Sequence, residues 1–384
     1  MTPVEFDFAT AGRVLFGPGR AAELPSLAKR FGSRALVCTG AEPGRHSAIF
    51  ETLGVPFSTF AVRGEPTVET ARSSAAFARA EGVDLVVALG GGSVVDLGKA
   101  VAMLLGNGGD PLDYLEVIGA GHIVGRPSVP LIAVPTTAGT GSEVTSNAVL
   151  ASPADGCKAS LRSPFMLPTV AVIDPLLTLS CPPGVTASSG LDALTQCLEP
   201  FVSVRANPMT DALAREGLRR AATGLRPSYA DGSNVIARTD MALCALIGGL
   251  ALANSKLGAV HGLAGVIGGT VEVPHGAACA ALLVATIEAN VTALRARDPG
   301  NQALSKYQMA AQLLTGRDDA AIEDGTAWIA ETVDLLAIGR LSRYGLTPEH
   351  AGEIVAKARQ ASSTKGNPIE LRADELHAVL AAAT

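Results

Sequence analysis

Hydrophobic positions divide the chain into a first half of short apolar runs and a second half of long periodic stretches. The runs lie at residues 35–39, 85–89, 131–134 and 170–173, and each is followed within three residues by glycine or proline. Short apolar runs with such ends are typical of strands buried on both faces. Between them, residues 69–81 and 94–105 carry apolar side chains every three or four positions, which predicts helices. Strands separated by helices predict parallel pairing in a doubly wound sheet.

Beyond residue 182 the strand signals stop and helical periodicity takes over. Ala- and Leu-rich patterns predict helices at residues 186–202, 208–225, 235–253, 277–296, 302–314, 320–336, 348–360 and 373–382. Asn207-Pro208 and Thr347-Pro348 are typical helix starts, with a capping side chain followed by proline in the first turn. We therefore predict an α/β domain with a mostly parallel sheet over residues 1–181 and an all-helical domain over residues 182–384.

Composition excludes several classes of protein. The 384 residues include 30 basic and 36 acidic side chains, a net charge of −6, without a lysine or arginine cluster. This balance disfavours nucleic acid and anionic membrane surfaces as partners. The six cysteines form no CxxC pair, the N-terminus lacks the pattern of a secretory signal, and apolar stretches such as residues 246–252 are interrupted. We predict a cytoplasmic protein with reduced cysteines and no membrane span, which would need about 20 apolar residues.

A glycine-rich turn follows the second predicted strand. Gly90-Gly91-Gly92-Ser93 opens the helix that contains Asp96 and Lys99. Glycines let a phosphate approach the backbone, and the first N–H groups of a helix favour negative charge. The turn differs from the GxGxxG fingerprint and from a P-loop. It predicts a phosphate site, against the plainer interpretation of a turn that only lets helix and sheet pack.

A second polar loop, Pro135 to Thr145, follows the next strand and concentrates threonine, serine and glycine. Hydroxyl and N–H groups can bind phosphate or ribose, although such loops also satisfy their own backbone. Two such loops at the carboxyl ends of neighbouring strands favour one ligand that contacts both.

The helical half holds a dispersed set of polar residues. Asp192 and Gln196 are four residues apart and share a helix face, while His261 and His275 lie in otherwise apolar surroundings. One carboxylate and two imidazoles are a plausible ligand set for a divalent transition metal. Spacing alone leaves the alternative that these histidines are hydrogen-bonded core residues.

In their order and spacing, these motifs resemble the iron-dependent (group III) alcohol dehydrogenases nearly end to end. The resemblance rests on Phe16–Gly19, Gly64–Thr67, Gly90–Lys99, Pro135–Thr145, Gly190–Thr195, His261-Gly262, Pro274–Gly276 and Gly366–Pro368. It implies an N-terminal nucleotide-binding domain, a C-terminal helical domain and a homodimer. It also implies NAD- or NADP-linked interconversion of a small alcohol and its aldehyde or ketone, normally on Fe²⁺ and sometimes on Zn²⁺.

The resemblance also assigns roles to individual residues. It implies that the dinucleotide is bound by Gly40, Gly91, Gly92, Ser93, Asp96, Thr136, Thr137, Ser142, Thr145, Lys158, Leu177 and Leu179. Lys158 would reach the ribose, and the two leucines would flank the nicotinamide or the adenosine. Asp192, His261 and His275 match three of the four family metal ligands and would be catalytic, and Gln196 stands at the fourth ligand position.

Three positions depart from the family pattern. Gln196 replaces a histidine ligand, and its neutral amide oxygen should bind Fe²⁺ or Zn²⁺ more weakly than imidazole. The site could therefore use the glutamine, be weakly occupied or be empty. Gly265 replaces a second histidine of many members, so it cannot relay a proton. Thr39-Gly40 lacks the acidic residue that would repel the 2′-phosphate of NADP, which leaves both NAD and NADP open.

The expected reaction is hydride transfer between nicotinamide C4 and a short, neutral carbonyl compound whose oxygen is polarised by the metal. Val260, Leu263 and Val266 suggest a modest apolar substrate pocket. Three alternatives stay open: a maleylacetate-reductase-like reductase of an acid substrate, a dehydroquinate-synthase-like lyase, and a metal-depleted nucleotide-binding protein. The first two should show cationic residues near the ligands, where the sequence offers only Lys256, and Gln196 suggests the third.

Overall fold

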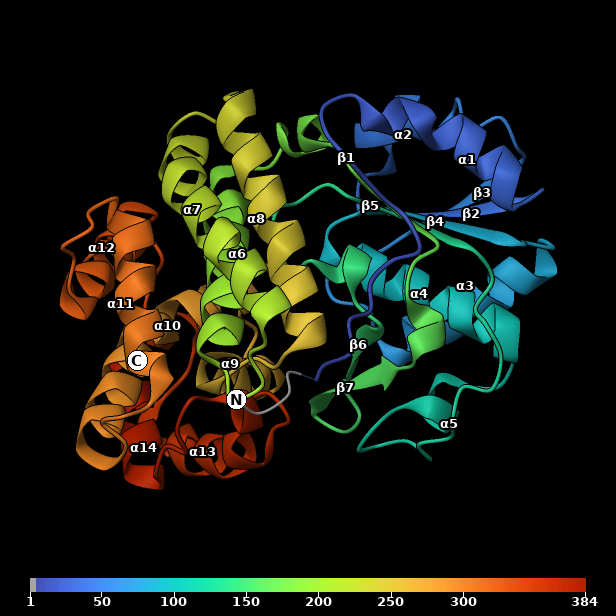
Figure 1. Ribbon diagram of the computed structural model, residues 1–384. Helices are drawn as coiled ribbons and strands as arrows, with labels where there is room; N and C mark the ends of the chain where they lie inside the picture. Colours follow the sequence, from blue (N-terminus) through green and yellow to red (C-terminus); the bar gives the residue numbers. More distant parts are fainter. Residues whose placement is uncertain (1–4) are drawn as a thin grey trace. The chain divides into compact units, whose positions relative to one another are not determined.

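The computed structural model describes residues 5–384, which divide into two units. Residues 10–137 and 141–179 form an α/β unit. Residues 180–384, together with residues 5–9 and 138–140, form a helical unit. Figure 1 shows the strands confined to the chain's blue-to-green first half and the helices that make up the yellow-to-red remainder.

The α/β unit is built on a six-stranded, fully parallel sheet with the order β1-β8-β5-β4-β2-β3. Its strands are β1 (Val14–Phe16), β2 (Ala35–Thr39), β3 (Phe57–Ala61), β4 (Leu85–Gly90), β5 (Leu131–Pro135) and β8 (Val170–Ile173). The four predicted strands are confirmed. The two edge strands were not predicted, because β1 has three residues and the residues of β3 are half-buried or exposed rather than continuously apolar.

Side chains on the two faces of the sheet belong to different hydrophobic cores. In β2, Leu36 and Cys38 join the core shared with α3 (Val68–Ala80) and α4 (Gly92–Asn107). Ala35 and Val37 join the core shared with α1 (Leu24–Phe31) and α2 (Ser47–Phe50). Figure 1 shows these two helix pairs on opposite faces of the sheet. The doubly wound architecture is therefore confirmed.

Two smaller features complete this unit. Strands β6 (Asn147–Ser152) and β7 (Cys157–Arg162) form an antiparallel hairpin outside the main sheet. The hairpin was not predicted, because its buried residues are separated by half-buried or exposed ones and neither strand is a continuous apolar run. A short helix, α5 (Pro111–Tyr114), precedes the long loop that leads to β5.

The helical unit contains α6 to α14, and all eight predicted stretches are helical within it. The bounds are α6 (Pro183–Val202), α7 (Pro208–Ala230), α8 (Val235–Asn254), α9 (Ala259–Thr270), α10 (His275–Arg297), α11 (Gln302–Thr315), α12 (Ile322–Leu335), α13 (Ala351–Gln360) and α14 (Ala373–Ala383). Asn207 caps α7 as predicted, since its side-chain oxygen accepts from the Met209 and Thr210 N–H groups. In the helix predicted at residues 348–360, the first three residues, Pro348–His350, form a 3₁₀ turn that leads into α13.

Helix α9 was not predicted, because glycine at positions 262, 265, 268 and 269 gives it poor helix propensity. Its first turn is held by distant side chains instead: Glu199 Oε1 accepts from the Val260 N–H at 2.8 Å, and Asn367 Oδ1 accepts from the Ala259 N–H at 3.1 Å. A Cβ on Gly262 would lie 1.9 Å from Thr364 Oγ1, so that glycine permits close packing. Tertiary contacts therefore form this helix where local sequence disfavours it.

Two helices of this unit, α8 and α10, are long and apolar enough to cross a membrane by length and composition alone. The expectation that no apolar stretch reaches such a length is wrong for them. Their most apolar windows are 61% and 67% buried inside the protein, as in core helices that pack against neighbours. Cys38, Cys197, Cys244 and Cys279 are buried cysteines that form no disulfide.

Candidate functional site

Three helices of the helical unit bring four metal-ligating side chains together. Asp192 comes from α6, His261 from α9, and His275 and Cys279 from α10, and one ligand atom of each lies within 4.8 Å of all the others. Only His275 is half-buried, and the other three are buried. Gly276 allows α10 to begin close to α6, because a Cβ there would lie 2.1 Å from the Ser188 carbonyl oxygen. The structure thus gathers Asp192, His261 and His275, which are 69 and 14 residues apart in sequence.

Two atoms of this cluster that could bind a metal have no hydrogen-bond partner among residues 5–384. They are Asp192 Oδ1 and His261 Nε2, which lie 3.3 Å apart. Buried polar atoms are nearly always paired, and a missing ion is one of the standard reasons for an exception. His275 Nε2 lies 4.0 Å from the same Asp192 oxygen. A divalent cation bound by these atoms would satisfy the two unpaired ones, so the residues fit a metal ion.

Two further residues of α6 hold the cluster in place. Gln196 Nε2 donates to Asp192 Oδ2 at 3.0 Å, and Glu199 Oε2 lies 2.6 Å from His261 Nδ1. A carboxylate on the far nitrogen of a histidine fixes its tautomer and orients the other nitrogen toward a metal. Glu199 was not singled out from the sequence, although it lies on the same face of α6, seven residues after Asp192.

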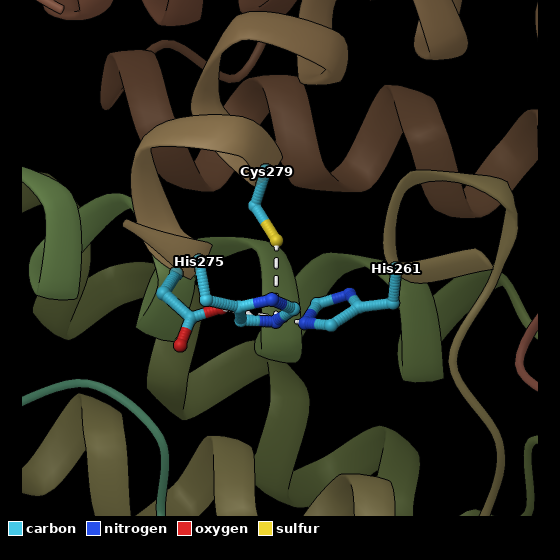
Figure 2. Close-up of side chains that lie close together, drawn as sticks. His261, His275 and Cys279 are labelled. Carbon is cyan, nitrogen blue, oxygen red and sulfur yellow. Dashed lines mark hydrogen bonds and ion pairs between the residues drawn. The ribbon is translucent and has the colours of Figure 1, made fainter. Parts of the chain in front are cut away.

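Cys279 is the second residue that the sequence analysis missed as part of the site. It lies four residues after His275 on α10, so both side chains project from one helix face. Figure 2 shows its sulfur directed at the imidazole of His275, with the ring of His261 on the other side of the cluster. The Sγ atom lies 3.6 Å from His275 Nε2. The spacing of four was the available signal, but an isolated cysteine in an apolar helix more often indicates a core residue.

The charges of the cluster are strongly coupled. Burial raises the pKa of Asp192, but the two imidazoles outweigh burial and hold that pKa below its ordinary value. Burial lowers the pKa of His261, but Cys279 and the carboxylates of Asp192 and Glu199 raise it by more. The groups around the imidazoles are therefore ones that favour positive charge on the ring nitrogens. A metal cation would replace those protons and keep the same charge balance.

In the α/β unit, the two predicted loops lie side by side. Gly90 pairs with Pro135 at the carboxyl ends of β4 and β5, and the Thr136 N–H donates to the Gly90 carbonyl at 3.0 Å. A Cβ on Gly91 would lie 3.4 Å from the Thr137 side chain. Gly91 is the N-cap of α4 and provides no capping side chain. The adjacent glycine and threonine loops thus surround the N-terminus of a 16-residue helix, where anions bind well.

Three other predicted cofactor residues take part in an internal network around Lys99. Asp96 Oδ1 accepts from the Ser142 hydroxyl at 2.5 Å, and Asp96 Oδ2 accepts from the Val149 N–H at 3.0 Å. The fully buried Lys99 donates to Thr145 Oγ1 at 2.8 Å and to the Asn147 carbonyl at 2.6 Å. These bonds join α4 to the loop after β5 and to the hairpin.

The remaining predicted cofactor residues are spread over the α/β unit. Lys158 forms an ion pair with Glu65 at 2.6 Å. Leu177 is buried in the core on the α1 face, and Leu179 is half-buried. Gly40 follows β2 and has no atom within 4 Å of the position that a Cβ would take. Ser93 lies in the first turn of α4.

The expected apolar substrate pocket is only partly present. Val260 and Leu263 are core residues with 1% and 0% exposure, and Val260 lines a small internal cavity together with Leu198 and Asn290. Val266 is half-buried at the edge of the helical core. Helix α9 turns the first two side chains into the interior of the unit, and their contact with a substrate stays a prediction.

An α/β unit with a glycine turn at a helix N-terminus, and a helical unit with a buried metal-ligating cluster, define a nucleotide-dependent metalloenzyme architecture. Comparison with known families makes this specific. The profile of the family "Iron-containing alcohol dehydrogenase" matches residues 11–175, and that of "Fe-containing alcohol dehydrogenase family, C-terminal" matches residues 186–384. The chain belongs to the iron-containing alcohol dehydrogenase family, as the sequence motifs predicted.

Individual relatives agree with this assignment. A long-chain-alcohol dehydrogenase of Geobacillus thermodenitrificans is 42% identical over 57% of this chain and 55% of its own length. A sulfoacetaldehyde reductase of Bilophila wadsworthia is 31% identical over 97% of both chains. Among solved structures, a 1,3-propanediol oxidoreductase superposes with a TM-score of 0.91 at 31% identity, covering 99% of this chain and 100% of that one.

A sulfoacetaldehyde reductase from Bifidobacterium kashiwanohense, solved in complex with NAD⁺, superposes with a TM-score of 0.86 at 28% identity over 99% of both chains. The family and these relatives show that the protein is an oxidoreductase of alcohols and aldehydes, as predicted.

Proposed function

We propose that the protein catalyses metal-dependent, NAD(P)-linked interconversion of a short, neutral alcohol and its aldehyde. In this proposal residues 1–181 bind the dinucleotide, and residues 182–384 bind the metal and the substrate. The observation that carries it is the buried cluster in which Asp192 Oδ1 and His261 Nε2 lack partners although they lie 3.3 Å apart. A divalent cation between them would pair both buried atoms.

Asp192, His261 and His275 would hold the metal, and Glu199 would orient His261 through its 2.6 Å contact. A bound divalent ion supplies Lewis-acid polarisation of the substrate oxygen, and the nicotinamide supplies or accepts the hydride. Gly265 has no atom within 4 Å of its Cβ position and provides no group that could take the proton. The proton therefore leaves through water, a ribose hydroxyl or another side chain.

For the dinucleotide, we assign the pyrophosphate to Gly91, Gly92 and Ser93 at the N-terminus of α4, with Thr136 and Thr137 beside them. The adjacency of these loops supports the assignment. Asp96, Ser142 and Thr145 bond within the protein, so we give them the part of positioning this loop. Lys158, Leu177 and Leu179 stay predictions that rest on the family resemblance.

We further propose that both NAD and NADP are accepted. Gly40 places no carboxylate after β2, so no like charge opposes a 2′-phosphate there. The Gly40→Asp variant tests this, since a side chain at this position meets no neighbour. We expect kcat/KM for NADPH to fall at least tenfold while that for NADH changes little. Equal losses with the two cofactors would contradict the proposal.

The metal requirement is tested by removing metal with a chelator and reloading with Fe²⁺, Zn²⁺ or Mn²⁺ before assaying a panel of neutral and acidic aldehydes. We expect activity on short neutral aldehydes that depends on the added metal and is lost in His275→Ala. Full activity of the metal-free protein would overturn the proposal, and inactivity under every condition would favour the nucleotide-binding alternative.

Preference for an acid substrate would favour the maleylacetate-reductase-like alternative. The structure gives that alternative and the lyase little support. Within residues 5–384, the hydrogen bonds and ion pairs of the four clustered side chains involve no lysine or arginine. The homodimer remains a prediction from the resemblance, and the cytoplasmic location remains one from the composition. Light scattering of the purified protein would test the dimer.

A further inference from the structure

We propose that Cys279 is the fourth metal ligand, so that the site is Asp192, His261, His275 and Cys279 rather than a set completed by Gln196. The thiolate makes the site selective for Zn²⁺ over Fe²⁺. This inference rests on the proposed function only in requiring that a divalent metal binds the cluster.

Two of the distances between the potential ligand atoms match the edges of one coordination tetrahedron, and a third is close to them. Bonds of about 2.0–2.3 Å to oxygen, nitrogen and sulfur place tetrahedral ligand atoms roughly 3.3–3.8 Å apart. The Asp192 Oδ1 to His261 Nε2 distance is 3.3 Å, and the Cys279 Sγ to His275 Nε2 distance is 3.6 Å. A third distance, from Asp192 Oδ1 to His275 Nε2, is 4.0 Å, and all four ligand atoms lie within 4.8 Å of one another. The sulfur thus lies where a fourth ligand is needed.

The direction of the Cys279 side chain agrees with these distances. Figure 2 shows the Cβ–Sγ bond pointing from α10 toward the imidazole of His275, with the ring of His261 next to it. The buried Cys197 and Cys244 contact each other at 3.8 Å instead, as two small apolar side chains in a core would. Cys279 differs from them because three metal-ligating atoms surround its sulfur.

The Gln196 side chain hydrogen-bonds Asp192 and does not face the proposed metal position with its oxygen. An ionised carboxylate only accepts hydrogen bonds, so the amide group that faces Asp192 Oδ2 at 3.0 Å must be the nitrogen. The amide oxygen is buried without a partner and lies against α8, where a Cβ on Gly248 would be 3.5 Å away. Gln196 is therefore a positioning residue that orients Asp192.

A thiolate changes which metal the site prefers. Soft sulfur ligands favour zinc, and Zn²⁺ also exceeds Fe²⁺ in the general order of divalent-metal affinities. An Asp/His/His/Cys set provides two anionic ligands and a soft donor, whereas a Gln ligand would add only a neutral oxygen. Selection of Zn²⁺ therefore follows from Cys279 and would weaken without it.

Titration of the metal-free protein with Co²⁺ tests the ligand assignment, since a thiolate–Co²⁺ bond produces a charge-transfer band in the near ultraviolet. The variants are Cys279→Ala and Cys279→Ser, with Cys157→Ser as the matched cysteine control and Gln196→Ala as the rival-ligand control. We expect one Co²⁺ per chain with the band in the wild type, Cys157→Ser and Gln196→Ala. Both Cys279 variants should lose the band, and their affinity for Co²⁺ should fall at least tenfold.

Competition between equal concentrations of Zn²⁺ and Fe²⁺ under anaerobic conditions, read out as metal content, tests selectivity. We expect Zn²⁺ to predominate in the wild type and its excess over Fe²⁺ to shrink at least tenfold in Cys279→Ser. Thermal unfolding identifies any variant that fails to fold, and His275→Ala then removes the metal site without touching the cysteine.

The outcomes separate this inference from the proposed function. Stoichiometric Co²⁺ without the band, or a band that survives in a folded Cys279 variant, overturns the thiolate ligand and leaves the metal-dependent function standing. A band lost in Gln196→Ala but kept in Cys279→Ser also overturns it. Failure of the wild type to bind Co²⁺, Zn²⁺ or Fe²⁺ overturns both.

Discussion

Two buried polar groups, one in each unit, show how a supporting network differs from a binding site. The network around Lys99 in the α/β unit is closed: its ammonium group donates to Thr145 and Asn147, and Asp96 accepts from Ser142 and Val149. The cluster around Asp192 in the helical unit is open, because Asp192 Oδ1 and His261 Nε2 have no hydrogen-bond partner in the described part of the chain. Closed networks fix a fold, whereas open ones require a ligand.

The largest expected effect comes from removing the charge at the centre of the open cluster. Asp192→Asn keeps the side-chain volume but removes the anionic ligand. Since Lewis-acid polarisation contributes several kcal/mol, turnover should fall roughly 10³-fold, together with bound metal. Steady-state kinetics and metal content measure this, and the exposed Asp318→Asn serves as control. Retained metal and activity would show that the Asp192 carboxylate is not needed to bind the metal.

Next in size is a pH effect in the α/β unit. Burial raises the pKa of Glu143 to about 7 from 4.5, although Lys99 opposes the rise. Between these pH values the unfolded chain loses the proton and the folded chain keeps it, so this group's contribution to stability falls as pH rises from 4.5 to 7. At 1.36 kcal/mol per pKa unit, the loss reaches at most about 3 kcal/mol.

Glu143→Gln removes that ionisation. We expect the variant to be more stable than the wild type at pH 8 and to differ little at pH 4.5, measured by urea unfolding at both pH values. The same difference at the two pH values would mean that Glu143 does not titrate in the folded protein within this window.

Removing the hydrogen bonds of Lys99 should lower the free energy of unfolding without changing metal binding at the Asp192 cluster. Lys99→Met keeps the buried stem but leaves the Asn147 carbonyl without its partner, which should destabilise the protein by about 2 kcal/mol. Urea unfolding measures the loss, and Lys357→Met, at an exposed ion pair of little value, provides the matched control. Loss of bound metal from a folded Lys99→Met protein would contradict the division between the two groups.

The smallest expected effect concerns the orientation of His261. Glu199→Gln retains an oxygen for the hydrogen bond but removes the charge, so metal affinity should fall about tenfold, the lower end for such partners. Competition with a chelator measures the affinity, with Glu288→Gln on the exposed face of α10 as control. An unchanged affinity would show that Glu199 only caps α9 through the Val260 N–H.

Much of the fold was readable because its signals are local. Four central strands and ten helices follow from apolar periodicity, and the loops after β4 and β5 were expected to be neighbours because parallel strands end at one edge. The signals failed where a feature depends on distant partners. Helix α9 has four glycines and forms because Glu199 and Asn367 bind its first turn, and β3 is an edge strand with little continuous burial.

The sequence by itself determined the two-part architecture, the glycine turn and three of the four clustered side chains, because each is encoded by a short pattern or a recognisable motif. Only the tertiary structure decided that Cys279 joins them and that Gln196 binds Asp192. The position of Cys279 depends on how α6, α9 and α10 pack, whereas the Gln196–Asp192 contact lies within α6, where the four-residue spacing allows it without showing which amide atom faces the carboxylate. No pattern along the chain records this packing, because side chains far apart in sequence meet only once the helices have packed.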